Sequence, residues 1–83
     1  MHIGEEIKKE LKRQERSVSW LARHIHCDRT NVYNIFRRKT IDTELLHTIS
    51  LALECDFFAR YSEALVAEKH RTEQSVETNS TKP

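Results

Sequence analysis

The residues of this 83-residue chain that could do chemistry form a basic stretch rather than a catalytic set. From Lys8 to Lys39 there are ten basic residues against three acidic ones, although the formal net charge of the whole chain is only +1. Such a stretch can steer binding to phosphate, although a solvated helical face would have a similar composition. Spacing brings together no Ser-His-Asp set, no paired carboxylates and no glycine-rich phosphate loop, so we do not expect catalysis.

Histidine and cysteine side chains could instead suggest a metal site. His24, His26 and Cys27 lie close together in the sequence, and His47 and Cys55 follow later. Structural zinc needs four ligands at defined spacing, and neither a Cys-x-x-Cys pair nor a His-x3-His pair occurs. We therefore expect no metal and no cofactor, and we interpret both cysteines as buried, reduced thiols.

The composition predicts a single all-α domain. One glycine and one proline nearly exclude tight hairpins, and the length leaves no room for a second core. No apolar run approaches the roughly 18 residues that cross a membrane, and the N-terminus has neither the basic start nor the apolar stretch of a secretory signal. We expect a cytoplasmic protein without a membrane partner.

Apolar residues recur at helical spacing in five segments, four of which follow a residue that can cap a helix. These candidate caps are Ser17, Asp28, Asp42 and Asp56. The expected helices cover about residues 3–15, 18–25, 29–37, 43–53 and 57–68. Because the apolar pattern stops near Glu68, we predict a folded domain over residues 1–68 and a disordered polar tail over residues 69–83.

The segment from Val18 to Arg37 is the most informative, because only about three residues, 26–28, join its two short helices. So short a link forces a sharp crossing, which needs one small residue and several apolar residues at the contact. The chain supplies Leu21, Ala22, Ile25, Cys27, Val32 and Ile35 at these positions. The segment resembles the helix-turn-helix of the Cro/Xre family, the lambda-repressor-like DNA-binding proteins of bacteria and phages.

The resemblance covers about Ile3 to Leu65, with residues 41–49 in the place of the family's capped fourth helix. It implies a five-helix lambda-repressor-like domain. The family usually has glycine at the turn position that His26 holds, where a left-handed backbone is common. Histidine adopts positive φ more often than most residues, and we expect it to cost about 1 kcal/mol relative to glycine.

The resemblance also implies that the third helix lies in the major groove of double-stranded DNA while the second crosses the backbone. Arg29 is the leading base reader, because a guanidinium can reach guanine O6 and N7 together. Thr30 and Asn34 match two further base-reading positions, whereas Tyr33 either packs on sugar or base edges or covers the turn. The expected phosphate contacts come from Ser17, Ser19, Asn31, Arg37, Arg38 and Lys39. For Ser17, a role as a plain helix cap is equally compatible.

The sequence thus predicts sequence-specific DNA binding by a transcriptional regulator of the repressor type. We also hypothesise a symmetric dimer formed through Phe58, Tyr61 and Leu65 of the fifth helix, the alternative being that these residues only close the core. Two other functions fit the same fold, namely an antitoxin whose acidic tail folds on a protein partner and an adaptor that does not bind DNA. Trp20 could lie against the first helix, the DNA backbone or a partner subunit.

Overall fold

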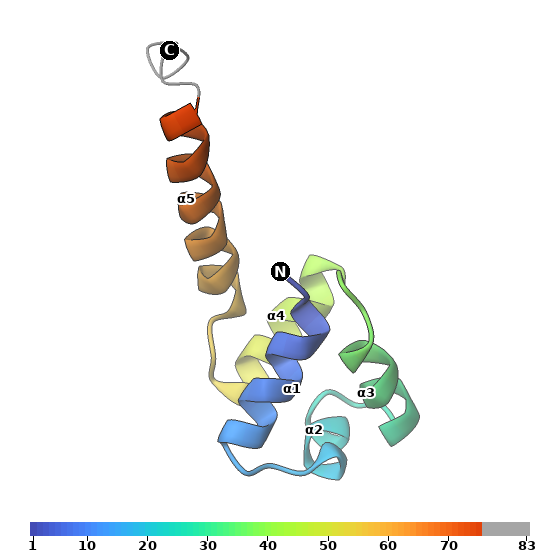
Figure 1. Ribbon diagram of the computed structural model, residues 1–83. Helices are drawn as coiled ribbons and strands as arrows, with labels where there is room; N and C mark the ends of the chain where they lie inside the picture. Colours follow the sequence, from blue (N-terminus) through green and yellow to red (C-terminus); the bar gives the residue numbers. More distant parts are fainter. Residues whose placement is uncertain (76–83) are drawn as a thin grey trace.

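The computed structural model describes residues 1–75, with side chains as far as Arg71, and Figure 1 shows how its helices are arranged. The helices are α1 (Ile3–Arg13), α2 (Val18–His24), α3 (Arg29–Phe36), α4 (Thr43–Leu53) and α5 (Phe57–Ser75). Residues 1–75 contain no strand, so the all-α prediction is confirmed. Helices α1 to α4 pack together, and α5 projects from them. None of these helices is both long enough and apolar enough to cross a membrane.

Four helices begin where the predicted caps place them. In each case a side-chain oxygen accepts a hydrogen bond of 2.7–3.0 Å from the backbone N–H three residues later. The four caps are Ser17, Asp28, Asp42 and Asp56. Each bond satisfies an N–H group that has no partner within its helix, so these short-range bonds set the helix starts.

Helix α5 is longer than predicted, because it continues to Ser75 instead of stopping near Glu68. Every side chain from Leu65 to Arg71 is exposed, so burial does not hold this part of the helix. Helix-favouring residues and a 2.7 Å ion pair between Glu68 and Arg71 support it locally, which an apolar pattern cannot reveal. Residues 69–75, the first part of the predicted polar tail, thus belong to α5, and residues 76–83 lie outside the described part of the chain.

One apolar core lies between the first four helices and the start of α5. Its fully buried side chains are Ile3, Ile7, Leu21, Val32, Ile49, Leu53 and Phe57. The predicted contacts between α2 and α3 belong to this core, since Ala22, Ile25, Val32 and Ile35 are all buried.

The two cysteines are less buried than predicted. Cys27 and Cys55 are both partly exposed, and neither forms a disulfide. Both lie in links between helices and pack against the edge of the core as partly buried residues. Partial burial still disfavours the thiolate and raises the pKa of both thiols.

The first residues of α1 contact the segment that follows α3. The backbone N–H groups of Ile3 and Gly4 donate to the carbonyl oxygens of Lys39 and Arg38, at 3.1 and 3.0 Å. These N–H groups have no partner within α1, so the segment after α3 satisfies them. A Cβ on Gly4 would lie 2.4 Å from each of two carbonyl oxygens near the end of α3. Only glycine allows this approach.

A buried carboxylate at the other end of α1 joins three helices. Glu10 is 4% exposed and accepts hydrogen bonds from Arg13, from Gln14 at 2.7 Å and from Arg60 of α5 at 2.9 Å. Gln14 also donates to the carbonyl oxygen of Leu53, at the end of α4. The hydrogen bond from Arg13, assisted by those from Gln14 and Arg60, outweighs burial and lowers the pKa of Glu10 to about 2.

Replacing Gly4 with alanine is expected to lower the free energy of unfolding by about 3 kcal/mol or more, because the added Cβ meets backbone that cannot move aside. In an ordinary helix interior, replacing glycine with alanine raises the free energy of unfolding by about 1 kcal/mol. A decrease at Gly4 would therefore indicate that the close backbone contact outweighs the helix preference of alanine. Urea unfolding followed by circular dichroism measures it. Lys8→Ala, an exposed change in the same helix, should stay within about 0.5 kcal/mol of the wild type. A Gly4→Ala protein of undiminished stability would contradict the close approach of α1 to α3.

The low pKa of Glu10 predicts a loss of stability in acid. Because this pKa lies near 2 in the folded protein and near 4.5 ordinarily, the charged carboxylate stabilises the fold above about pH 4.5. That contribution, about 2 to 3 kcal/mol, should disappear as the pH falls from 5 to 2. The Glu10→Gln protein should be less stable than the wild type at pH 7. Its free energy of unfolding should also decrease less than that of the wild type between pH 5 and pH 2. Urea unfolding at a series of pH values compares the two proteins, and parallel curves would refute the prediction.

Candidate nucleic-acid interface

The turn between α2 and α3 sets the direction of α3. His26 has φ 60°, the left-handed conformation expected at this position. The Cys27 N–H then donates to the carbonyl oxygen of Ala22 at 2.9 Å, which closes the end of α2. Two residues later Arg29 begins α3, with Asp28 as its cap. The link between α2 and α3 therefore consists of His26 in the left-handed conformation, the Cys27 hydrogen bond that closes α2 and the Asp28 cap that begins α3.

Helix α3 turns one face to the core and the other to solvent. Its buried residues are Val32, Ile35 and Phe36. The exposed residues of α3 and its C-cap are Arg29, Thr30, Asn31, Tyr33, Asn34 and Arg37. The sequence assigned all six to contacts with DNA, with covering the turn as the alternative for Tyr33. Since the helix contains no acidic residue, its outer face offers hydrogen-bond donors without a competing carboxylate.

Two of the candidate base readers contact their own helix. Arg37 donates through Nη2 to the Oδ1 atom of Asn34, so one lone pair of that oxygen is engaged, while its second lone pair and the amide nitrogen are available to adenine. The Tyr33 ring meets Phe36 edge-on, with centroids 6.1 Å apart, and remains 52% exposed. Tyr33 thus covers part of the core while a large area of its ring is still accessible.

A groove beside α3 brings together three of the predicted contact residues. Asn31, Asn34 and Arg38 line it, although the sequence assigned two of them to phosphate and one to a base. Its other lining residues are Ile25, Cys27, Ile35 and Leu45, the last from α4. The sequence did not indicate this groove, because its walls come from segments that meet only in the fold.

The basic segment after α3 is held in place through its backbone. Arg38 and Lys39 are exposed, while their carbonyl oxygens accept the hydrogen bonds from the start of α1. Two positive side chains therefore extend from a fixed backbone near the C-terminal end of α3, where positive charge is favourable. Gly4, which permits this attachment, was not among the residues that the sequence singled out.

The serines lie at the start of α2. Ser17 acts as the cap, so its oxygen accepts from the Trp20 N–H while its hydroxyl hydrogen can still be donated. Ser19 follows in the first turn and is partly buried. Both remain candidates for contacts with phosphate.

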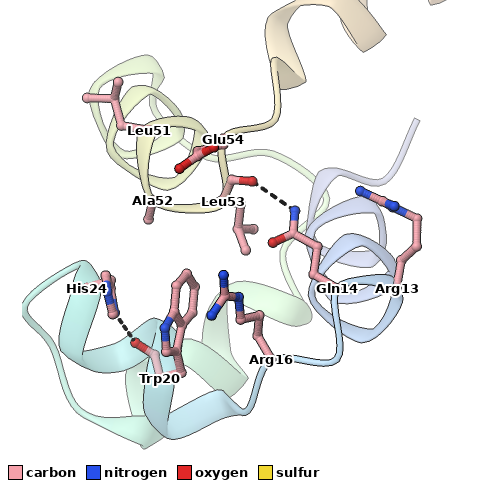
Figure 2. A pocket seen from close by; sticks show the side chains of 9 residues that line it. All are labelled: Arg13, Gln14, Arg16, Trp20, His24, Leu51, Ala52, Leu53 and Glu54. Atoms are coloured by element: carbon pink, nitrogen blue, oxygen red, sulfur yellow. Dashed lines mark hydrogen bonds between the residues drawn. The ribbon is translucent and has the colours of Figure 1, made fainter.

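Trp20 lies away from the outer face of α3. Figure 2 shows its ring between His24, at a centroid distance of 4.0 Å, and the guanidinium of Arg16, 4.4 Å from the ring centroid. The stack borders a pocket of about 620 Å³ whose lining comes from α1, α2, α4 and adjoining links, without any residue of α3. Of the three options for Trp20, the structure supports packing within the domain, against the link that follows α1.

Over residues 1–75, no three His, Cys, Asp or Glu side chains are grouped so that they could hold a metal ion. The chain matches no family model, no curated protein and no solved structure. The helix-turn-helix interpretation thus depends on the turn, the outer face of α3 and the basic segment that follows it.

Replacing His26 with glycine is expected to raise the free energy of unfolding by about 1 kcal/mol, because glycine adopts φ near 60° without the penalty of a side chain. Thermal unfolding should show a higher melting temperature. His47→Gly, in the interior of α4, should have the opposite effect and cost about 0.5 kcal/mol, because glycine favours a helix even less than histidine does. A lower melting temperature for His26→Gly would show that the His26 side chain stabilises the turn.

Proposed function

We propose that the protein binds specific sequences of double-stranded DNA and acts as a transcriptional regulator of the repressor type. The observation that carries the proposal is the outer face of α3, which exposes polar and basic side chains on a helix held by buried Val32 and Ile35. An α-helix with its side chains is about 10–12 Å across, and the major groove of DNA is about 12 Å wide. Helix α3 therefore suits insertion into that groove.

The first turn of α3 is proposed to read bases. Arg29 is the first residue of the helix and is exposed, so its guanidinium can pair with O6 and N7 of guanine. Thr30 beside it can contact a thymine methyl group or donate a hydrogen bond. One turn later, Asn34 can pair with adenine through its amide nitrogen and the second lone pair of its oxygen.

Residues on both sides of this turn are proposed to hold the phosphate backbone. Arg38 and Lys39 extend from backbone that α1 fixes, so their positions relative to α3 are set before DNA binds. Ser17 and Ser19 can donate hydroxyl hydrogens from the start of α2. Asn31 and Arg37 add further donors. Such contacts position α3 without reading sequence, and they make the affinity depend on salt.

Arg29→Ala and Arg38→Ala should affect DNA binding in different ways. Arg29→Ala is expected to relax the preference at one or two base pairs, with a loss of about 1 to 3 kcal/mol of discrimination. Arg38→Ala should weaken binding to all sequences alike and reduce the slope of log K against log salt by about 1. Selection of bound DNA from a random pool gives the first result, and titrations at several salt concentrations give the second.

Lys9→Ala is the matched control, because Lys9 is an exposed basic residue of α1 outside the proposed interface. It should leave both the selected sequence and the salt dependence unchanged. An unchanged sequence preference for Arg29→Ala would rule out Arg29 as a base reader. A wild-type protein that selects no DNA would overturn the proposed function and favour an adaptor on the same fold.

A further inference from the structure

The pocket beside Trp20 is bordered by two opposite charges that the fold does not pair. Its volume of about 620 Å³ lies within the range of about 300–1,000 Å³ that small-molecule sites occupy. One charge is the guanidinium of Arg16, on the link after α1, and the other is the carboxylate of Glu54, at the end of α4. Figure 2 shows them on opposite walls of the pocket. Neither belongs to an ion pair in the part of the chain that the structure describes.

Other polar side chains at the pocket are already engaged in holding its wall. Arg13 donates to the buried carboxylate of Glu10. Gln14 donates through Nε2 both to Glu10 and to the carbonyl oxygen of Leu53, so both hydrogens of its amide are used. These bonds join the end of α1 to the end of α4. The charges that remain available to a ligand are thus the two described above.

The guanidinium of Arg16 is held in position by an aromatic stack. It lies over the ring of Trp20, 4.4 Å from the ring centroid. His24 stacks on Trp20 at a centroid distance of 4.0 Å and donates through Nδ1 to the Trp20 carbonyl oxygen at 2.8 Å. No described residue accepts a hydrogen bond from the guanidinium, so its N–H groups are available. A cation fixed in this way loses little conformational freedom when it binds a carboxylate.

Helix α4 adds an apolar surface to the same pocket. Figure 2 shows the side chains of Ala52 and Leu53 directed from α4 towards α2, where Trp20 lies. Leu51 also lines the pocket and is 67% exposed. An aliphatic group placed between α4 and Trp20 would remove apolar surface from water on both sides. The pocket therefore offers a cation, an anion and an apolar wall to one small molecule.

We propose that this pocket binds a free amino acid with an aliphatic side chain. Its carboxylate pairs with the guanidinium of Arg16, which can donate two parallel hydrogen bonds. Its ammonium group pairs with the carboxylate of Glu54, and its side chain lies against Ala52 and Leu53. A ligand with only one charge would use only one of the two available partners, so the pocket favours a molecule that carries both.

The proposed ligand site is separate from the proposed DNA interface. It uses no residue of α3 or of the basic segment after it, so it goes beyond the proposed function and does not depend on it. Its test contains no DNA. A failure of one proposal therefore leaves the other unaffected.

Fluorescence titration of the full chain tests the site, because Trp20 is the only tryptophan and borders the pocket. The probe is L-leucine, which should change the emission saturably with a Kd of about 1 mM or tighter, as expected for a ligand of so few atoms. Isocaproate lacks the ammonium group of leucine and isoamylamine lacks its carboxylate, and each should bind at least tenfold more weakly. Equal affinities for the three compounds, or no saturable response to L-leucine, would overturn the proposal.

Substitutions at the two charges assign each group of the ligand to its partner. Arg16→Gln and Glu54→Gln should each weaken the binding of L-leucine at least tenfold, with circular dichroism to verify that both variants are folded. Arg16→Gln should also remove the preference for leucine over isoamylamine, and Glu54→Gln the preference over isocaproate. Arg23→Gln and Glu44→Gln are the matched controls, because they remove the same charges from exposed positions of α2 and α4 outside the pocket. Losses as large in the controls would contradict the assignment.

Heteronuclear NMR locates the bound probe independently of fluorescence. L-leucine should shift the indole N–H signal of Trp20 and the amide signals at the end of α4, and it should leave those of α3 in place. Shifts confined to another part of the chain would show that L-leucine binds elsewhere and would exclude this pocket.

Discussion

The close approach of α1 to the end of α3 is the constraint on which the rest of the domain depends. Gly4 lets the two backbones meet, and the first N–H groups of α1 then bond to the carbonyl oxygens of Arg38 and Lys39. The same bonds satisfy groups that would otherwise lack partners at a helix start and fix the segment from which two basic side chains extend. Helix α1 thus contributes to the proposed interface without presenting a side chain there.

The opposite end of α1 organises the remaining helices. Glu10 binds Arg60 of α5, and its neighbour Gln14 binds the last residue of α4. A buried carboxylate is tolerated here because two guanidinium groups and an amide donate to it. Helix α1 therefore connects the end of α3, which carries the proposed DNA contacts, with the start of α5.

Helices α2 and α3 illustrate how much this support matters. They have seven and eight residues, too few for stable helices on their own. Their caps set where they begin, but their stability comes from the core beneath them. The rigidity of the outer face of α3 is consequently a property of the whole domain. A substitution at Gly4, which is far from α3 in the sequence but touches its end in the fold, should therefore affect that face.

By itself the sequence determined the features that arise within a few residues. Caps such as Asp28 and the apolar period of α3 involve only near neighbours in the chain, so residue type and spacing were enough to predict them. The left-handed backbone at His26 is also local, but its prediction came from the family resemblance. The tertiary structure decided the rest. Glu10 and Arg60 are fifty positions apart, Gln14 and Leu53 thirty-nine, and no periodic pattern records such pairs. The need for glycine at position 4 likewise follows only from how closely two backbones approach one another in the folded chain.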